Sequence, residues 1–315
     1  MSKFSDKVKA LKPVAFLIKV SKKIILPGFD GTPLYDVLVF FVRGIQKGAI
    51  STRASSLAFH FFLAIFPAII FLFTLIPYIP VDNFQAELLD LLKSLMPHSA
   101  YQASLDTLQD IINRQRGDLL SVGFIAALYF ATNGVNAMFA AFNNTYHSIE
   151  SRTFITQRLV AVVITILLST LVLVSILLII FGQMFLDLLV EHNFMKADLT
   201  YYGITILKWI VILALIFFTI SFLYWAGPAK KVKWRFFSAG SSLATFLMVI
   251  TSLAFSYYVN NFSQYNKLYG SIGTLIVILL WLEFNSFALL IGFELNASID
   301  NAKKQNVSLE EASKV

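Results

Sequence analysis

The sequence predicts an all-α, polytopic membrane protein: a six-transmembrane-helix bundle with amphipathic N-terminal helices and a helical external loop. Two observations lead to this class. Charged residues make up only 14% of the 315 residues, whereas soluble globular domains carry about 25%. Long stretches without Lys, Arg, Asp or Glu also recur along the chain, and a membrane-spanning helix needs about 20 mostly apolar residues.

Six apolar stretches predict the membrane-spanning helices, within a transmembrane domain at residues 53–299. The last stretch is interrupted by Glu283 and Glu294, yet it still reads as one helix, GTLIVILLWLEFNSFALLIGFEL. The predicted spans cover residues 54–80, 119–147, 159–183, 205–227, 237–260 and 269–297. The third and fourth spans are almost purely aliphatic and aromatic, which favours the lipid-facing periphery.

The distribution of basic residues predicts the orientation of these spans. The segments before the first span, after the second, after the fourth and after the last hold 19 Lys and Arg, whereas the alternate loops hold 5. Cytoplasmic loops of membrane proteins are enriched in Lys and Arg. We therefore expect both the N- and the C-terminus to be cytoplasmic.

Three regions outside the spans have their own character. We predict that residues 1–52 form a basic, amphipathic region, in which Pro33 starts the helix PLYDVLVFFVRGIQKG and the sequence around KVSKKIIL is a second candidate helix. Such a region either lies in the membrane interface or packs on the bundle as a cytoplasmic helix. Residues 82–118 predict an acidic, helical external loop. Residues 300–315 predict a cytoplasmic tail, which we expect to be disordered after Asn301.

Polar side chains inside the spans predict a candidate pathway, because polar groups are costly in a bilayer and mark functional sites. Successive helical residues differ by about 100° in direction, so the polar groups of each span can be sorted by face. Pro67 should also kink the first span. The pathway residues lie on the first, second and sixth spans: Glu283, Glu294, Asn296, His60, Asn133, Asn136, Asn144 and Pro67.

Each of these groups also has a structural interpretation. Serines at four-residue spacing, such as Ser238 and Ser242, are common where membrane helices pack together. For His60, an interhelical hydrogen bond is favoured over proton exchange. For Glu283, near the middle of its span, a functional role is favoured, and a buried structural hydrogen bond is the alternative.

The last span also carries a family motif. YGSIGTLIVILLWLEFNSFALLIGFELNA resembles the Tyr-Gly … Trp … Gly-x-Glu-Leu-Asn ending of the YihY/BrkB family of bacterial inner-membrane proteins, and SSLAFHFFLAIFP and LYWAGPAKKVKWRFFSAG fit the same family. In the second span the chain has Phe130-Ala131 where the family usually has Trp-Ser. The matching positions are Tyr269, Gly270, Gly273, Trp281, Gly292, Glu294 and Asn296. The resemblance implies a six-helix protein of the bacterial inner membrane.

That family has carried the label ribonuclease BN, and the residues argue against the label. The four histidines lie in different segments, no short-spaced metal motif, phosphate loop or nucleophile triad is present, and Cys is absent. We expect no enzyme activity, no cofactor, no metal and no nucleic-acid partner. Location and architecture predict a transporter or flippase for an envelope lipid or small amphiphile, with membrane lipids as partners. A non-catalytic scaffold or assembly factor is the alternative, and the oligomeric state stays open.

Overall fold

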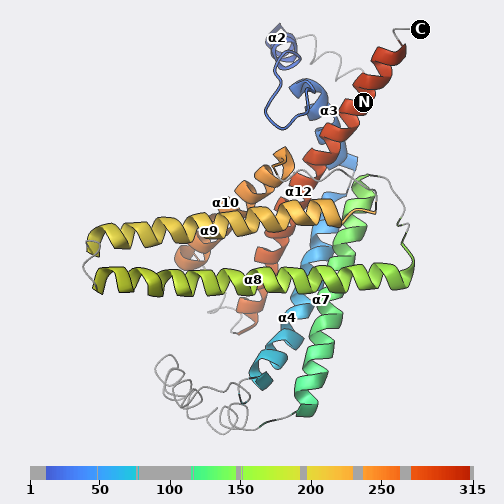
Figure 1. Ribbon diagram of the computed structural model, residues 1–315. Coiled ribbons are helices and arrows are strands. Elements are labelled where there is room, and N and C mark those ends of the chain that lie inside the picture. Colours follow the sequence, from blue (N-terminus) through green and yellow to red (C-terminus); the bar gives the residue numbers. More distant parts are fainter. Residues whose placement is uncertain are drawn as a thin grey trace.

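The computed structural model consists of helices joined by turns and loops, and it shows no strand among the residues that it describes (Figure 1). Two short N-terminal helices are α2 (Lys12–Ser21) and α3 (Leu34–Lys47). The six long helices are α4 (Ile50–Leu75), α7 (Gly117–Thr145), α8 (Phe154–Glu191), α9 (Ala197–Ala226), α10 (Ala239–Phe262) and α12 (Ser271–Ala312). The described residues are 12–47, 49–75, 77, 115, 117–146, 150, 152–191, 197–229, 237–262 and 271–312.

Each of the six long helices is long and apolar enough to cross a membrane. A helix rises about 1.5 Å per residue, so even α10, with 24 residues, reaches the roughly 30 Å thickness of a bilayer's hydrocarbon core. The predicted class, an all-α protein with six membrane-spanning helices, is confirmed. The predicted external loop falls mostly on residues 82–114, which lie outside the described residues.

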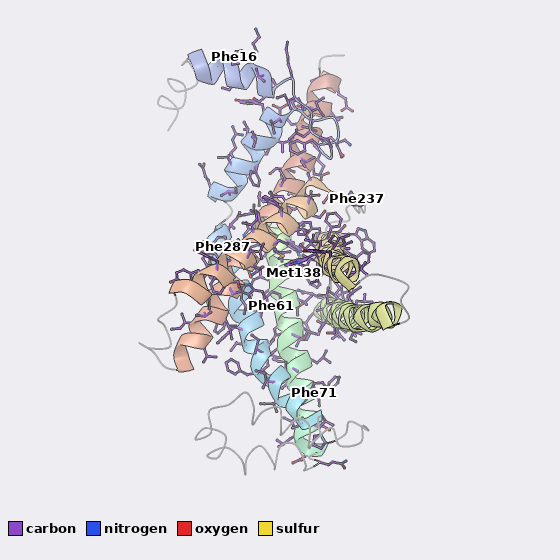
Figure 2. All side chains as sticks on the ribbon, turned by 90° about the vertical axis from the view of Figure 1, so that its left-hand side faces the viewer. Phe16, Phe61, Phe71, Met138, Phe237 and Phe287 are labelled. Carbon is purple, nitrogen blue, oxygen red and sulfur yellow. The ribbon has the colours of Figure 1, made fainter. Side chains whose placement is uncertain are left out.

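The helices form a core and a projecting hairpin. Helices α4 and α7 lie side by side, and α12 packs against both α4 and α10. Helices α8 and α9 form an antiparallel hairpin that crosses the α4–α7 pair at a steep angle and extends to one side (Figure 1). Figure 2, turned by 90°, shows this hairpin nearly end-on beside the core.

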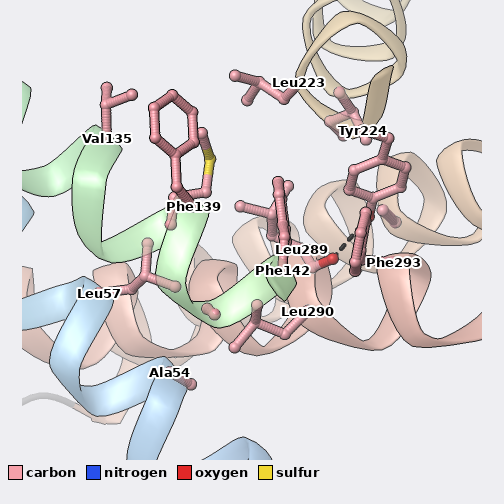
Figure 3. Close-up of a cluster of buried hydrophobic side chains, with 14 of the residues drawn as sticks. Ala54, Leu57, Val135, Phe139, Phe142, Leu223, Tyr224, Leu289, Leu290 and Phe293 are labelled. Carbon is pink, nitrogen blue, oxygen red and sulfur yellow. Dashed lines mark hydrogen bonds between the residues drawn. The ribbon is translucent and has the colours of Figure 1, made fainter. Parts of the chain in front are cut away.

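Aromatic packing fills the centre of the core, where α7, α9 and α12 meet (Figure 3). The rings of Phe142 and Phe293 are stacked with centroids 4.0 Å apart, and Tyr224 meets both rings at steep angles. The Tyr224 hydroxyl donates a 2.6 Å hydrogen bond to the carbonyl oxygen of Leu289. The buried phenol is therefore satisfied, as a polar group in an apolar core must be.

A helical cap closes one end of the molecule. Helix α3 starts directly after Pro33, whose fixed φ suits a helix start, and carries Asp36 in its first turn. It packs on the last turns of α12, where Val37 and Ile299 are buried together. Because α12 continues to Ala312, the expectation of a disordered tail after residue 301 was wrong. The second candidate helix, around KVSKKIIL, is displaced toward the N-terminus, since α2 includes only the first three residues of that stretch and ends at Ser21.

Candidate functional site

A buried ion pair joins three helices where the cap meets the core. Arg53, in the first turn of α4, is 8% exposed and faces α7 and α12. Its Nη1 donates to the carbonyl oxygen of Ala141 at 2.8 Å and to Thr145 Oγ1 at 2.7 Å. Its Nη2 lies 3.8 Å from Oε2 of Glu294, which is 5% exposed on α12. One guanidinium therefore connects α4, α7 and α12.

The cap adds a fourth helix to this ion pair. Gly44 of α3 packs directly on the Glu294 carboxylate, and a Cβ atom at residue 44 would overlap it. The Nε and Nη2 atoms of Arg53 are buried and make no hydrogen bond within the described residues. Arg53 and Glu294 thus attract each other by charge without a hydrogen bond on that side. Residues of α3, α4, α7 and α12 surround the pair.

Asn296 connects α12 to the start of α10. Its Nδ2 donates to Ser238 Oγ at 2.9 Å, and its Oδ1 accepts from the backbone N–H of Gly240 at 2.8 Å. Ser238 also caps α10, because its Oγ accepts from the N–H of Ser241 at 3.0 Å. The backbones of Gly240 and Gly292 touch at this crossing, so both positions require glycine. Asn296 therefore joins α12 to the start of α10.

A second polar network fixes the segment that follows α9. Asn143 of α7 is buried, donates to Glu150 Oε2 at 2.8 Å and accepts from the N–H of Ala229 at 2.8 Å. Arg152 pairs with Glu150 at 3.1 Å and donates from Nη2 to the carbonyl oxygen of Gly227 at 2.8 Å. Sequence reasoning did not place Asn143, Glu150, Arg152 or Arg53 in the site. The signal that could have found this network is an acid and a base, Glu150 and Arg152, shortly after the intramembrane Asn143.

Glu283 and His60 have different surroundings. Glu283 is half-buried on α12, and its Oε1 accepts a 2.6 Å hydrogen bond from Ser55 Oγ on α4. His60 makes its 2.7 Å bond from Nδ1 to the carbonyl oxygen of Ser56 within its own helix, so Nδ1 carries the proton. The described contacts do not join His60 to Glu283.

The predicted asparagine face of α7 divides three ways. Asn133 accepts a 2.6 Å hydrogen bond from Arg158 Nη1, which ties α7 to the start of α8. The Oδ1 of Asn136 is buried and has no hydrogen-bond donor among the described residues. Asn144 is exposed. Pro67 lies half-buried inside α4, which continues for two more turns beyond it.

A cavity of about 450 Å³ lies in the angle between the α8–α9 hairpin and the core. All six long helices contribute side chains to its wall, and Thr219 is the only polar residue among the described residues that line it. Figure 2 labels two wall residues, Phe61 and Met138, on adjacent helices. The lining consists of Phe61, Val135, Met138, Leu168, Leu171, Ile212, Leu215, Ile216, Thr219, Ile220, Leu223, Met248 and Leu289. None of the eight predicted pathway residues borders it, so the polar pathway stays a prediction.

Comparison with known proteins decides the family. The family model described as Virulence factor BrkB matches residues 41–314. This chain belongs to the BrkB family. The motif resemblance of the last span is thereby confirmed, and the protein is an integral membrane protein of that family.

Relatives of this BrkB-family protein come from several bacteria. The ribonuclease-like protein YfkH of Bacillus subtilis is 34% identical over 254 residues, which cover 80% of this chain and 91% of that protein. The UPF0761 membrane protein NTHI0384 of Haemophilus influenzae is 23% identical over 268 residues, covering 85% and 96%. Smlt0865 of Stenotrophomonas maltophilia is 26% identical over 264 residues, covering 81% and 59%. No solved structure matches.

The described part of this BrkB-family chain has no cluster of side chains that could bind a metal ion. No group of three or more His, Asp or Glu side chains lies close enough there to hold a metal ion. The two acids in the span of α12 instead contact a basic and a hydroxyl group: Glu294 pairs with Arg53, and Glu283 accepts from Ser55. The described structure therefore combines an apolar cavity with polar side chains that bond one helix to another.

Proposed function

We propose that this BrkB-family protein moves a lipid or small amphiphile within or across the membrane, as a transporter or flippase and without enzyme activity. The apolar cavity between the hairpin and the core is the observation that carries the proposal. Its volume falls within the roughly 300–1,000 Å³ of ligand sites, and its apolar lining favours a hydrocarbon chain. A charged, water-soluble substrate would lose its hydration there without compensation.

Glu283 supports this proposal from the polar side. An ionisable residue inside a membrane span marks a functional pathway by default. Glu283 lies six residues before the cavity residue Leu289 on α12, about 9 Å along the helix axis. Its carboxylate is half-buried and contacts Ser55 of α4. We propose that it meets the polar end of the amphiphile while the apolar part enters the cavity.

We also propose the orientation expected from the basic residues, with both ends on the cytoplasmic side of a bacterial inner membrane. The cap helices α2 and α3 and the end of α12 lie at the same end of the molecule (Figure 1). Arg53 and Arg152 both lie near this end, in the first turn of α4 and beside the end of α9. This placement agrees with a cytoplasmic excess of basic residues.

A scaffold or assembly factor is the second candidate, and one observation favours it. Several polar residues expected to line a pathway instead make direct bonds between helices: Asn296 to Ser238, Asn133 to Arg158, and Glu294 to Arg53. Such bonds fix the helices in one arrangement. In this role the cap and the outer face would bind partner proteins, and the cavity would hold ordinary membrane lipid.

Lipid transfer in vesicles tests the first proposal. Ile216→Trp places a larger side chain in the cavity wall, whereas Ile210→Trp places the same side chain on an exposed part of α9. We expect purified protein in phosphatidylcholine vesicles to move a fluorescent phosphatidylglycerol to the other leaflet, as followed by dithionite bleaching. Ile216→Trp should slow this transfer at least tenfold and Ile210→Trp should not. Equal rates for all three proteins, or a rate equal to that of empty vesicles, would favour the scaffold.

A further inference from the structure

Helix α3 has two apolar faces, and the described structure covers only one of them. Val37, Phe40 and Gly44 lie within about 60° of one another around the helix and pack on α12. The second face lies about 130° away and carries Leu38, Val42 and Ile45, which are 43%, 48% and 38% exposed. A helix that packed only on the bundle would be polar on that second side. The apolar sector therefore points to a second contact.

The uncovered face starts where the membrane-spanning core ends. Gly44 contacts Glu294 near the end of the last span, and α4 begins at Ile50. From Ile45 back to Leu38 the face extends about 10 Å along the helix. The headgroup layer on one side of a bilayer is roughly 5–8 Å thick. The face therefore extends through the depth at which amphipathic helices meet headgroups and upper acyl chains.

The charges around this face select the kind of membrane. Residues 12–47 contain six Lys and Arg but only two acids, Asp30 and Asp36. Both acids contact α12: Asp30 lies 3.4 Å from Lys303 Nζ, and Asp36 accepts a 3.4 Å hydrogen bond from Asn306. Arg43 adjoins Val42 in the chain, and its side chain is exposed, as are those of the basic residues of the α2 end: Lys19, Lys22 and Lys23. The acids thus contact the protein, while the four cations, of which Lys22 lies over the Tyr35 ring, remain exposed and within reach of anionic headgroups.

We propose that the Leu38–Val42–Ile45 face of α3 is a binding surface for anionic phospholipid at the cytoplasmic interface of the membrane. The apolar side chains enter the upper acyl region, and Arg43 with the lysines of the α2 end contacts the phosphate groups. This surface settles the two alternatives for the N-terminal region, since α3 packs on the bundle with one face and lies against lipid with the other. It does not depend on lipid transport.

The absence of cysteine makes this surface directly testable. A single Val42→Cys change in the full-length chain accepts an environment-sensitive fluorophore, and Gln305→Cys, an exposed polar site on the cap portion of α12, is the matched control. Each labelled protein is placed in vesicles of phosphatidylcholine alone or of equal parts phosphatidylcholine and phosphatidylglycerol. Quenching by doxyl lipids reports contact with the bilayer, and quenching by iodide reports contact with water.

We expect lipid quenching at position 42 to exceed that at position 305 several-fold, and to be several-fold stronger with phosphatidylglycerol. Changing the four exposed cations, Lys19, Lys22, Lys23 and Arg43, to Gln should remove the difference between the two lipid compositions. Iodide quenching at position 42 equal to that at position 305 would overturn the proposal. Protection from both quenchers would overturn it as well, because a protein or a second copy would then cover the face. Equal lipid quenching in both compositions would refute the anionic selectivity.

Discussion

Glu294→Gln should lower the free energy of unfolding by about 3–5 kcal/mol, because it leaves the buried Arg53 cation without its counter-charge. Both side chains are less than a tenth exposed, and the closest nitrogen and oxygen atoms are 3.8 Å apart. At an effective dielectric constant of about 20, two unit charges at that distance attract by about 4 kcal/mol. The isosteric amide removes this attraction while keeping the volume that packs against Gly44.

A double-mutant cycle isolates the ion pair from the other bonds of the arginine. Arg53→Met loses two hydrogen bonds as well, to the Ala141 carbonyl oxygen and to Thr145 Oγ1. It also leaves the Glu294 carboxylate in an apolar site without its cation. Adding Glu294→Gln to Arg53→Met removes that second charge. The double variant should therefore lose about 2–3 kcal/mol less unfolding free energy than the sum of the two single losses, as expected for residues in direct contact.

Unfolding in detergent, titrated with sodium dodecyl sulfate and followed by tryptophan fluorescence, measures these energies. Glu283→Gln is the matched control, since it is the same change on the same helix, and in the described structure Glu283 contacts a hydroxyl group of Ser55 rather than a cation. It should change the unfolding free energy by about 1 kcal/mol or less. If Glu294→Gln costs no more than Glu283→Gln, or if the cycle is additive, the Arg53–Glu294 pair does not hold the helices as described.

Three further substitutions test other contacts by the same unfolding assay. Gly292→Ala should cost about 1–3 kcal/mol, because its methyl group overlaps the backbone of α10, whereas Gly203→Ala, with nothing within 4 Å of its added methyl, should cost nothing. Asn143→Leu should cost about 2–6 kcal/mol, because the carboxylate it binds and the N–H of Ala229 each lose a partner at about 1–3 kcal/mol. His60→Ala should cost less than about 1 kcal/mol and leave lipid transfer intact, since its hydrogen bond stays within α4. A folded His60→Ala protein without transfer would instead place His60 in the pathway.

The fold was predictable from the sequence because the bilayer imposes strong rules on composition and length. Charge-free stretches located all six long helices, and Pro33 located the start of α3. What failed was the end of α12, where AKKQNVSLEE lacks apolar periodicity and reads as a tail. It is helical because Ile299 and Ala302 pack on α3, and Asn306 and Lys303 bond to the cap. Such a tertiary contact leaves no local pattern.

The site was harder to predict, because helical periodicity sorts residues into faces without saying which face turns inward. In α7 the counted face was Asn133, Asn136 and Asn144, yet Asn144 is exposed and the adjacent Asn143 is buried. Partners outside the helix decide such cases, and the N–H of Ala229, 86 residues away in sequence, is one of them. Asn143 meets Glu150 across the end of its own helix.

The position of the polar bonds determines which walls of the cavity are free to move. The core wall is held by the buried Arg53–Glu294 pair and by the half-buried Asn296, which together join α4, α7, α10 and α12. The hairpin wall packs on the core mainly through α7 and α10, and near the end of α9 Tyr224 also donates to the Leu289 carbonyl oxygen of α12. Its polar bonds to α7, such as Arg158 to Asn133, lie in the first turns of α8. Leu168 and Leu171, the cavity residues of α8, lie three to four turns beyond that bond. A change in cavity volume that keeps every buried polar bond must therefore come from the hairpin pivoting about its root, because movement within the core would break the ion pair.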